Sequence, residues 1–150
     1  MTNLCPCGSS RLLHDCCGKY IDQQQYAATA EQLMRSRYTA FVLGESDYLL
    51  QTWHSSTRPA SLSGLHLQWF HLAIVATEQG MPDDDRGMVS FIASYRQGIK
   101  AKQLHERSRF VREEGRWYYV DGDCHSTTIG RNDACPCGSN HKFKRCWCAK

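Results

Sequence analysis

Residues 86–120 read RGMVSFIASYRQGIKAKQLHERSRFVREEGRWYYV, and this stretch decides the fold class. Every second residue of its first part is apolar or aromatic: Val89, Phe91, Ala93 and Tyr95. A second set of alternating residues would share one face of a later strand: Leu104, Glu106, Ser108 and Phe110. A period of two predicts β-strands, and Glu114-Gly115 predicts a tight turn into another strand at 117–120. We therefore expect consecutive antiparallel strands.

The chain before this stretch has a helical period. Apolar and aromatic residues recur at spacings of three and four between residues 33 and 42, as an amphipathic helix requires. Gly44 is placed to end this helix, and Glu45-Ser46-Asp47 is placed to start a second, shorter helix. Helices followed by consecutive strands predict an α+β fold, in which a curved antiparallel sheet packs on the helices and its concave side encloses a pocket.

Two nearly identical cysteine clusters flank this central region. One begins with Cys5-Pro6-Cys7-Gly8-Ser9 and the other with Cys135-Pro136-Cys137-Gly138-Ser139. In both, one residue separates the first two cysteines and eight residues separate the second from the third. Eight of the nine cysteines belong to the clusters: Cys5, Cys7, Cys16, Cys17, Cys135, Cys137, Cys146 and Cys148. The ninth is Cys124.

Four clustered thiolates suit Zn²⁺, which prefers four tetrahedral ligands. The proline between the paired cysteines restricts the backbone, and Gly8 and Gly138 allow the chain to reverse. Because four thiolates leave no open coordination position, we expect two structural zinc sites, the C-terminal one with the weaker ligand set. The alternatives are disulfides, unconnected free thiols, or iron–sulfur clusters, for which these segments are very short.

Charge and composition limit the compartment and the partners. No run of about 18 apolar residues exists, and the first residues lack the charged and apolar regions of a secretory signal, so we expect a cytoplasmic protein. The formal net charge is +3, from 18 Lys and Arg against 15 Asp and Glu. Each four-thiolate zinc site adds −2, so two sites would change the net charge from +3 to −1. A general nucleic-acid-binding surface is therefore not expected.

Three parts are expected along the chain. They are an N-terminal zinc motif at 3–20, a central α+β domain at 21–128 and a C-terminal zinc motif at 133–150. The segment TTIGRND at 127–133 has the composition of a linker. In this interpretation the zinc motifs are appendages, and the central domain stays folded when they lose their metal.

The clusters resemble the SEC-C motif, a zinc-binding module at the tail of the SecA translocase ATPase and at the ends of many bacterial proteins. The resemblance rests on the pattern C-P-C-G-S and on two closing ligands, which follow after eight residues counted from the second cysteine. The N-terminal copy closes with the adjacent Cys16 and Cys17, as the motif does. The resemblance implies zinc as the metal at both ends.

The C-terminal copy departs from the motif at its end. It has the typical basic stretch at 142–145, but Trp147 separates Cys146 from Cys148. Either Cys148 reaches the metal by a looser turn, or the site has three firm ligands and a lower affinity. His141 is the alternative fourth ligand.

The resemblance extends across the centre of the chain. The segments MRSRYTAF at 34–41, TWHSSTRP at 52–59 and HERSRF at 105–110 are similar to the YchJ family of uncharacterised bacterial proteins. This resemblance implies a nuclear-transport-factor-two-like central domain, a cone-shaped curved sheet of the cystatin-like roll type packed on helices. It implies no established reaction.

Several polar residues are candidates for a site in the expected pocket. Glu106 alternates with apolar residues of the same strand face, so we expect its side chain to point inward. Together with His54 and Arg58 it would supply the polar groups of a small-molecule or catalytic pocket. A buried carboxylate needs a partner, although a purely structural pair is the favoured interpretation. Three arginines are candidates for that partner: Arg35, Arg37 and Arg58.

The remaining candidates are His105 and the pair Cys124-His125. Cys124 beside a histidine has the elements of an activated thiol. Cysteine is also among the residue types most often buried, so a buried core cysteine is the favoured prediction. The aromatic residues between 69 and 119 are interpreted as sheet core.

These observations favour a non-enzymatic interaction or adaptor protein that docks on a protein partner through its zinc motifs. The analogy with the translocase tail, whose SEC-C module contacts an export chaperone and lipid, implies a translocation- or ribosome-associated partner. The basic residues Lys142, Lys144 and Arg145 form a second candidate contact, for RNA or anionic lipid. A homodimer through the exposed face of the sheet is a further expectation. The alternative function is a cavity that binds a small molecule or catalyses a reaction.

Overall fold

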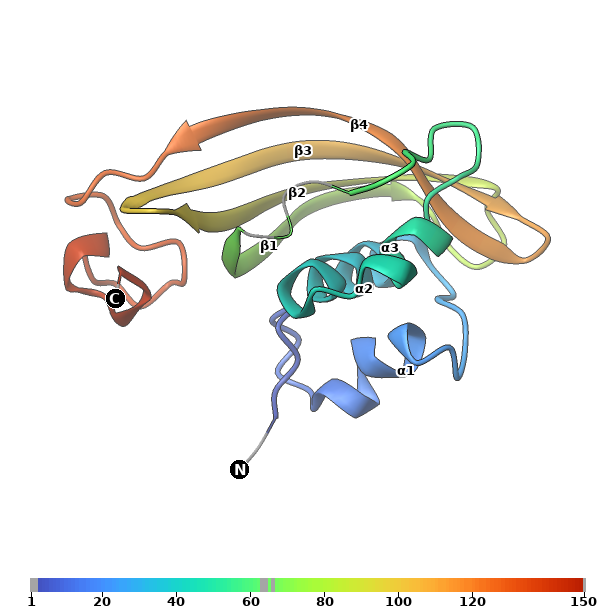
Figure 1. Cartoon of the computed structure of the whole chain (residues 1–150), viewed down its shortest axis with the longest axis horizontal. Coiled ribbons are helices and arrows are strands. Elements are labelled where there is room, and N and C mark those ends of the chain that lie inside the picture. Colours follow the sequence, from blue (N-terminus) through green and yellow to red (C-terminus); the bar gives the residue numbers. More distant parts are fainter. Residues whose placement is uncertain (1–2, 63–64, 66, 150) are drawn as a thin grey trace.

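The computed structural model describes residues 3–62, 65 and 67–149, which form a four-stranded antiparallel sheet with helices under its concave side (Figure 1). The strand order is β1-β2-β3-β4, so each strand pairs with the next along the chain. The strands are β1 (Gln68–Gln79), β2 (Arg86–Gln97), β3 (Lys100–Glu113) and β4 (Arg116–Thr128). The α-helices are α1 (Cys17–Ile21), α2 (Ala30–Leu43) and α3 (Ser46–Gln51). Short 3-10 helices are η1 (Leu13–Asp15), η2 (Phe143–Arg145) and η3 (Trp147–Ala149).

Helix α2 is the element on which the sheet and the N-terminal segment meet. It begins where the Thr29 side chain accepts a hydrogen bond from the Gln32 backbone N–H at 3.1 Å, and it ends at Gly44, whose φ is 76°. The helix contacts β1, β2 and β4 on one side and α1 on the other. In Figure 1 it therefore lies between the sheet and the N-terminal segment.

Turns and bulges shape the sheet. Glu114 and Gly115 form the two-residue turn between β3 and β4, and their φ values of 53° and 78° are those that such a hairpin needs. Register shifts occur in β1 between Trp69 and His71 and between Ile74 and Ala76, and in the β3–β4 pair between Arg109 and Phe110. Bulges increase the local twist and bend a strand, which agrees with the long curved strands of Figure 1.

The start of α2 is held against the β1–β2 connection by two glycines. The Ala30 N–H donates to the Gly80 carbonyl at 2.9 Å. A Cβ atom on Gly87 would lie 2.5 Å from the Gly80 Cα atom, so no side chain fits at that position. The absence of both side chains permits the helix and the sheet to approach this closely.

The main core lies between the concave face and the helices. Trp117, Phe110, Val89 and Leu49 are at most 2 % exposed, and the Trp117 Nε1–H donates to the Ala28 carbonyl at 3.1 Å. A second, smaller core holds the C-terminal segment against the end of the sheet where β2 meets β3. Its buried members are Ala101, Ile129, Cys135, Phe143 and Cys146.

The structure confirms the predicted α+β class and the curved antiparallel meander. The first helix ends at Gly44 as predicted, the second covers 46–51, and the turn at Glu114-Gly115 is present. The linker prediction was too long, because Thr127 and Thr128 belong to β4 and pair with β3. Residues 3–62, 65 and 67–149 contain no helix with the length and apolar character needed to cross a bilayer.

Truncation of Trp117 tests the main core. We expect Trp117→Ala to lower the free energy of unfolding by about 3–5 kcal/mol, because it removes a large buried ring and leaves a cavity. Ile99, which is 99 % exposed in the turn after β2, provides the control, and Ile99→Ala should change stability by about 0.5 kcal/mol or less. Urea denaturation of both variants measures the difference. Equal stabilities would show that Trp117 does not contribute to the core as described.

Candidate metal centres

The two cysteine clusters fold into the same local structure up to the third cysteine. In each, the first cysteine N–H donates to a carbonyl six residues on: Cys5 to Arg11 at 2.8 Å and Cys135 to His141 at 2.9 Å. The following glycine has positive φ in both, 84° at position 8 and 80° at position 138. This chain reversal brings the third cysteine of each cluster close to the first two. It explains why both clusters have cysteine and glycine at the same spacing.

The sulfur atoms of each cluster gather at the spacing of a tetrahedral metal site. The tetrads are Cys5, Cys7, Cys16 and Cys17, and Cys135, Cys137, Cys146 and Cys148, with all four Sγ atoms of each within 4.8 Å of one another. Sγ–Sγ distances are 3.7 Å for Cys7–Cys16, 4.0 Å for Cys16–Cys17 and 3.5 Å for Cys137–Cys146. A tetrahedron with Zn–S bonds of about 2.3 Å has edges of about 3.8 Å. The donor sets therefore fit Zn²⁺.

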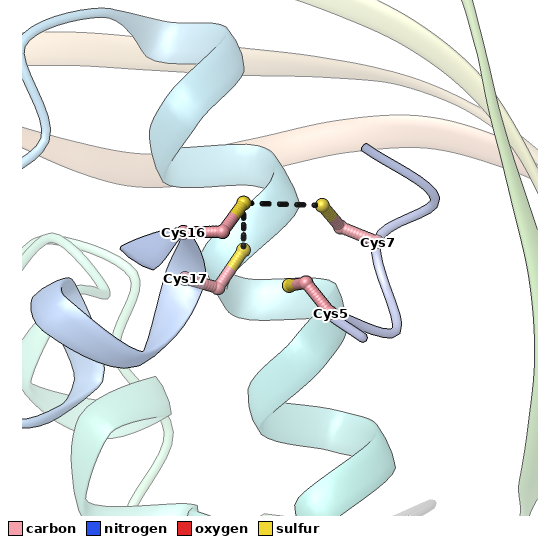
Figure 2. A group of neighbouring side chains, drawn as sticks. All are labelled: Cys5, Cys7, Cys16 and Cys17. Carbon is pink, nitrogen blue, oxygen red and sulfur yellow. Dashed lines mark hydrogen bonds between the residues drawn. The ribbon is translucent and has the colours of Figure 1, made fainter. Parts of the chain in front are cut away.

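The N-terminal tetrad is buried against α2, and its sulfurs point toward one another (Figure 2). The Cys5 Sγ lies 3.6 Å from the Thr39 hydroxyl, and Arg35 donates to the Cys7 carbonyl at 2.8 Å. Hydrogen bonds from Cys17 and Cys7 lower the pKa of Cys5 to about 3, which favours the thiolate form that binds metals. The pKa of Cys17 is raised, chiefly by its contact with Cys5.

The N-terminal cluster is part of the main core. Its four cysteines pack in one apolar cluster with α2 residues such as Leu33 and Met34 and with Leu72 of β1. This arrangement argues against the expectation of a separate appendage whose metal is irrelevant to the central domain. Since the cysteines contact the helix that supports the sheet, loss of the tetrad would disturb the core directly.

The C-terminal tetrad is completed by a different route. Cys148 lies in η3, and its sulfur joins those of Cys135, Cys137 and Cys146, whereas His141 is exposed and lies outside this group. Ser139 donates to the Cys146 sulfur at 3.4 Å, and this hydrogen bond is the main cause of a pKa of about 6 for that thiol.

The C-terminal cluster attaches to the sheet through few contacts. Phe143 stacks on Phe70, the extra residue at the first bulge of β1, with ring centroids 6.0 Å apart. The Ile129 N–H donates to the Ala101 carbonyl at 2.8 Å, which continues the pairing beyond β4. Cys137 and Cys148 are half-buried, whereas all four N-terminal cysteines are buried. This cluster is therefore the more accessible of the two.

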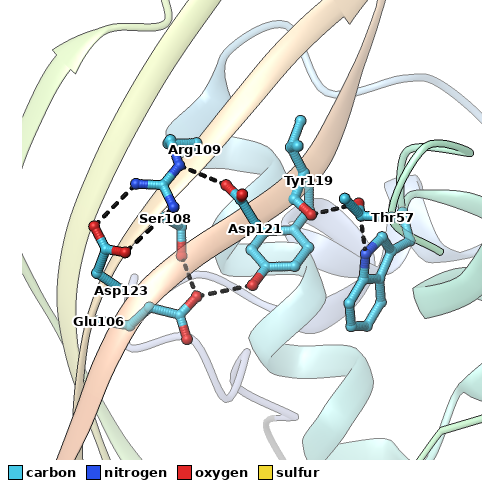
Figure 3. Close-up of polar contacts among 9 residues, drawn as sticks. Thr57, Glu106, Ser108, Arg109, Tyr119, Asp121 and Asp123 are labelled. Carbon is cyan, nitrogen blue, oxygen red and sulfur yellow. Dashed lines mark hydrogen bonds and ion pairs between the residues drawn. The ribbon is translucent and has the colours of Figure 1, made fainter. Parts of the chain in front are cut away.

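The concave side of the sheet encloses a cavity of about 200 Å³. Glu106 points into it as predicted, and its Oε2 accepts hydrogen bonds from the Ser108 hydroxyl at 2.6 Å and the Tyr119 hydroxyl at 3.1 Å (Figure 3). The walls are mainly apolar and aromatic, and they include Arg37. Trp69 and Tyr119 also line the cavity, so these aromatic residues are cavity walls as well as sheet core.

Two of the three predicted pocket residues lie elsewhere. His54 is outside the cavity lining, with its Nε2 2.7 Å from a Glu113 carboxylate oxygen and its Nδ1 2.7 Å from the Ser56 hydroxyl. Arg58 is exposed and donates to the Trp53 carbonyl at 3.0 Å. The predicted combination of Glu106, His54 and Arg58 is therefore wrong, because the loop after α3 turns these two side chains away from the cavity.

The prediction for Cys124 is also wrong. Its thiol is exposed, because β4 beyond residue 120 is an edge strand that the helices do not cover. His125, next to it, stacks on His105 of β3 with ring centroids 4.7 Å apart and an interplanar angle of 3°. Strand register alone brings these two histidines together, and no spacing within the sequence indicates it.

Comparison with known proteins agrees with both parts of this description. The family model described as YchJ, middle NTF2-like domain, matches residues 29–122, and that of the SEC-C motif matches residues 1–19 and 131–150. A SEC-C motif-containing protein from Rhodopseudomonas palustris, solved in solution, is 33% identical and has a TM-score of 0.70, covering 82% of this chain and 98% of its own. A crystal structure of a SEC-C motif-containing protein from Psychrobacter arcticus is 28% identical, with a TM-score of 0.65, 97% of this chain covered and 94% of its own.

The fourth ligand of the C-terminal site can be tested by substitution. We expect Cys148→Ser to reduce the zinc content from two ions per chain toward one, because its sulfur completes the tetrad. His141→Ala is the matched control and should keep both ions, since this exposed histidine lies outside the sulfur group. Elemental analysis of the purified variants gives the answer. Zinc loss in the histidine variant alone would assign the ligand to His141.

The two sites should also differ in how fast they release zinc. Under a chelator we expect the C-terminal site to lose its metal first, because two of its cysteines are half-buried. Zinc release followed with a colorimetric indicator should show two phases, and Cys135→Ser should remove the faster one. Removal of the slower phase by this substitution would reverse the assignment.

Proposed function

This chain belongs to the YchJ family, and we propose that it is a zinc-binding, non-enzymatic interaction protein whose C-terminal SEC-C module docks on a protein partner. Zinc motifs at 3–20 and 133–150 would flank the central domain at 21–128. All eight clustered thiolates would bind metal, with one Zn²⁺ in each tetrad. Four thiolates per ion leave no position for substrate, so both ions would hold structure rather than perform chemistry.

One observation carries the docking proposal: the C-terminal cluster displays its basic residues outward from a small, separate core. Phe143 is buried on the sheet, whereas Lys142, Lys144 and Arg145 on either side of it are exposed. The motif thus presents a small group of exposed cationic side chains to solvent. A partner with an acidic surface is the chemistry that complements it, by charge attraction and short-range ion pairs.

The N-terminal module would have a structural role in this proposal. Its tetrad packs into the main core, and Arg35 of α2 bonds directly to its backbone. A module fixed in this way supports the central domain and keeps the docking module on a stable base.

Charge reversal tests the docking surface. Proteins captured from lysate by the zinc-loaded chain would be purified and titrated against Lys144→Glu, with Arg86→Glu as the control because Arg86 is an exposed basic residue at the start of β2. We expect Lys144→Glu to weaken binding by about tenfold, with a steep salt dependence, and Arg86→Glu to stay within about twofold of the wild type.

Three outcomes would contradict the proposal. Equal affinities of both variants would place the contact elsewhere. Capture that disappears after ribonuclease treatment would assign the surface to RNA, and binding to anionic vesicles without any captured protein would assign it to lipid.

A further inference from the structure

Arg37 has an unusual position in the wall of the cone cavity. Its side chain is 5% exposed, and one guanidinium nitrogen donates to the Leu49 carbonyl at 2.8 Å and the Thr52 hydroxyl at 2.7 Å. The guanidinium also lies over the rings of Trp53 and Tyr119, 5.2 Å and 4.7 Å from their centroids. All these neighbours are neutral, and Glu106 of the same cavity acts on the guanidinium through its charge alone, without an ion pair. Burial lowers the pKa of Arg37 to about 10, so the group stays charged at neutral pH.

No carboxylate within the described residues forms an ion pair with Arg37. A buried charge is costly unless a counter-charge or several hydrogen bonds compensate it. Only one of its three nitrogens has a hydrogen bond among the described residues. The cavity wall thus contains a buried cation that retains donors for an anion.

Glu106 supplies the opposite polarity in the same cavity. Both of its hydrogen bonds, from Ser108 and Tyr119, reach the same carboxylate oxygen, Oε2. Its other oxygen, Oε1, accepts no hydrogen bond from the described residues. Oε1 is also not fully buried, so it is accessible as an acceptor. Within the described part of the chain Glu106 and Arg37 form no ion pair with each other.

The remaining side chains of the cavity wall favour a ligand with a flat apolar ring. Its aromatic members are Tyr38, Phe41, Trp53, Trp69, Phe91, Phe110 and Tyr119. The volume of about 200 Å³ is enough for one substituted ring, since a cavity of about 150 Å³ accepts benzene.

From this arrangement we propose that the cone cavity binds a small aromatic carboxylic acid that carries a hydroxyl or amino group. The carboxylate bonds to the free donors of Arg37, the ring packs among the aromatic side chains, and the hydroxyl or amino group donates to Glu106. A neutral apolar ligand would leave the free donors of Arg37 without an acceptor, and a cationic group beside them would be repelled by the guanidinium. This function is separate from the zinc modules.

Three probes of one shape test the proposal on the full zinc-loaded chain. 4-Hydroxybenzoate has the carboxylate and the donor, 4-hydroxybenzamide replaces the carboxylate with a neutral amide, and benzoate lacks the donor. We expect 4-hydroxybenzoate to bind at least about tenfold more tightly than either of the others, because each lost partner leaves a buried polar group unpaired. Isothermal titration or NMR titration measures the affinities.

The location of the probe is read from indole N–H signals. We expect the signals of Trp53 and Trp69, which line the cavity, to shift on titration, and that of Trp117, which does not, to stay in place. Equal affinities for the acid and the amide would contradict the proposal, as would a shift confined to Trp117. Absence of saturable binding of all three probes at 10 mM, a concentration chosen for weak ligands, would also overturn it.

Substitutions separate binding from folding, because Arg37→Gln alone risks unfolding the protein. Glu106→Gln keeps the shape and should reduce the preference for 4-hydroxybenzoate over benzoate about tenfold, because loss of the Glu106 charge acts on both anions alike and only 4-hydroxybenzoate loses its acceptor. Ala93→Leu fills the cavity and should abolish binding, whereas Ile92→Leu, on the opposite face of the same strand, is the control and should bind as the wild type does. The Trp117 signal reports whether each variant is folded. Wild-type affinity in folded Ala93→Leu would place the ligand outside the cavity.

Discussion

The mutual approach of four sulfur atoms beside helix α2 is the constraint on which this structure depends. Cys5, Cys7, Cys16 and Cys17 place their sulfurs within 4.8 Å of one another, and four ionised thiolates at that distance repel each other unless a cation lies among them. The tetrad contacts α2 through Thr39, and the same helix supports the concave side of the sheet. A bound metal would therefore stabilise the packing of the cone as well as the short N-terminal segment.

The two SEC-C modules have nearly the same backbone and different surroundings. The N-terminal one has become part of the main core, whereas the C-terminal one is held by a small core around Phe143 and keeps its basic residues exposed. In the proposed function this difference would separate two tasks. The N-terminal module would support the fold, and the C-terminal module would bind a partner without disturbing it.

The sequence predicted the elements whose signals are local. Cysteine spacing located both tetrads, alternation predicted the strands and the inward direction of Glu106, and Gly44 marked the end of α2. It failed where the answer depended on contacts between distant segments. His54 and Arg58 were expected in the pocket, but the loop after α3 directs them away, and Cys124 is exposed because its strand is an uncovered edge. Arg37 was considered only as a partner for Glu106, since a helix pattern cannot show that its guanidinium is buried with unused donors and without an ion pair.

We expect the N-terminal candidate metal site to be coupled to the fold of the central domain, and the C-terminal one not to be. The most direct test is thermal unfolding of the variants Cys5→Ser and Cys135→Ser, followed through the indole N–H signal of Trp117. Each variant removes one sulfur from one tetrad, so the two are chemically matched. We expect Cys5→Ser to lower the Tm by about 10 °C or more and Cys135→Ser to change it by about 2 °C or less. Equal Tm values, or a larger loss in Cys135→Ser, would contradict the account.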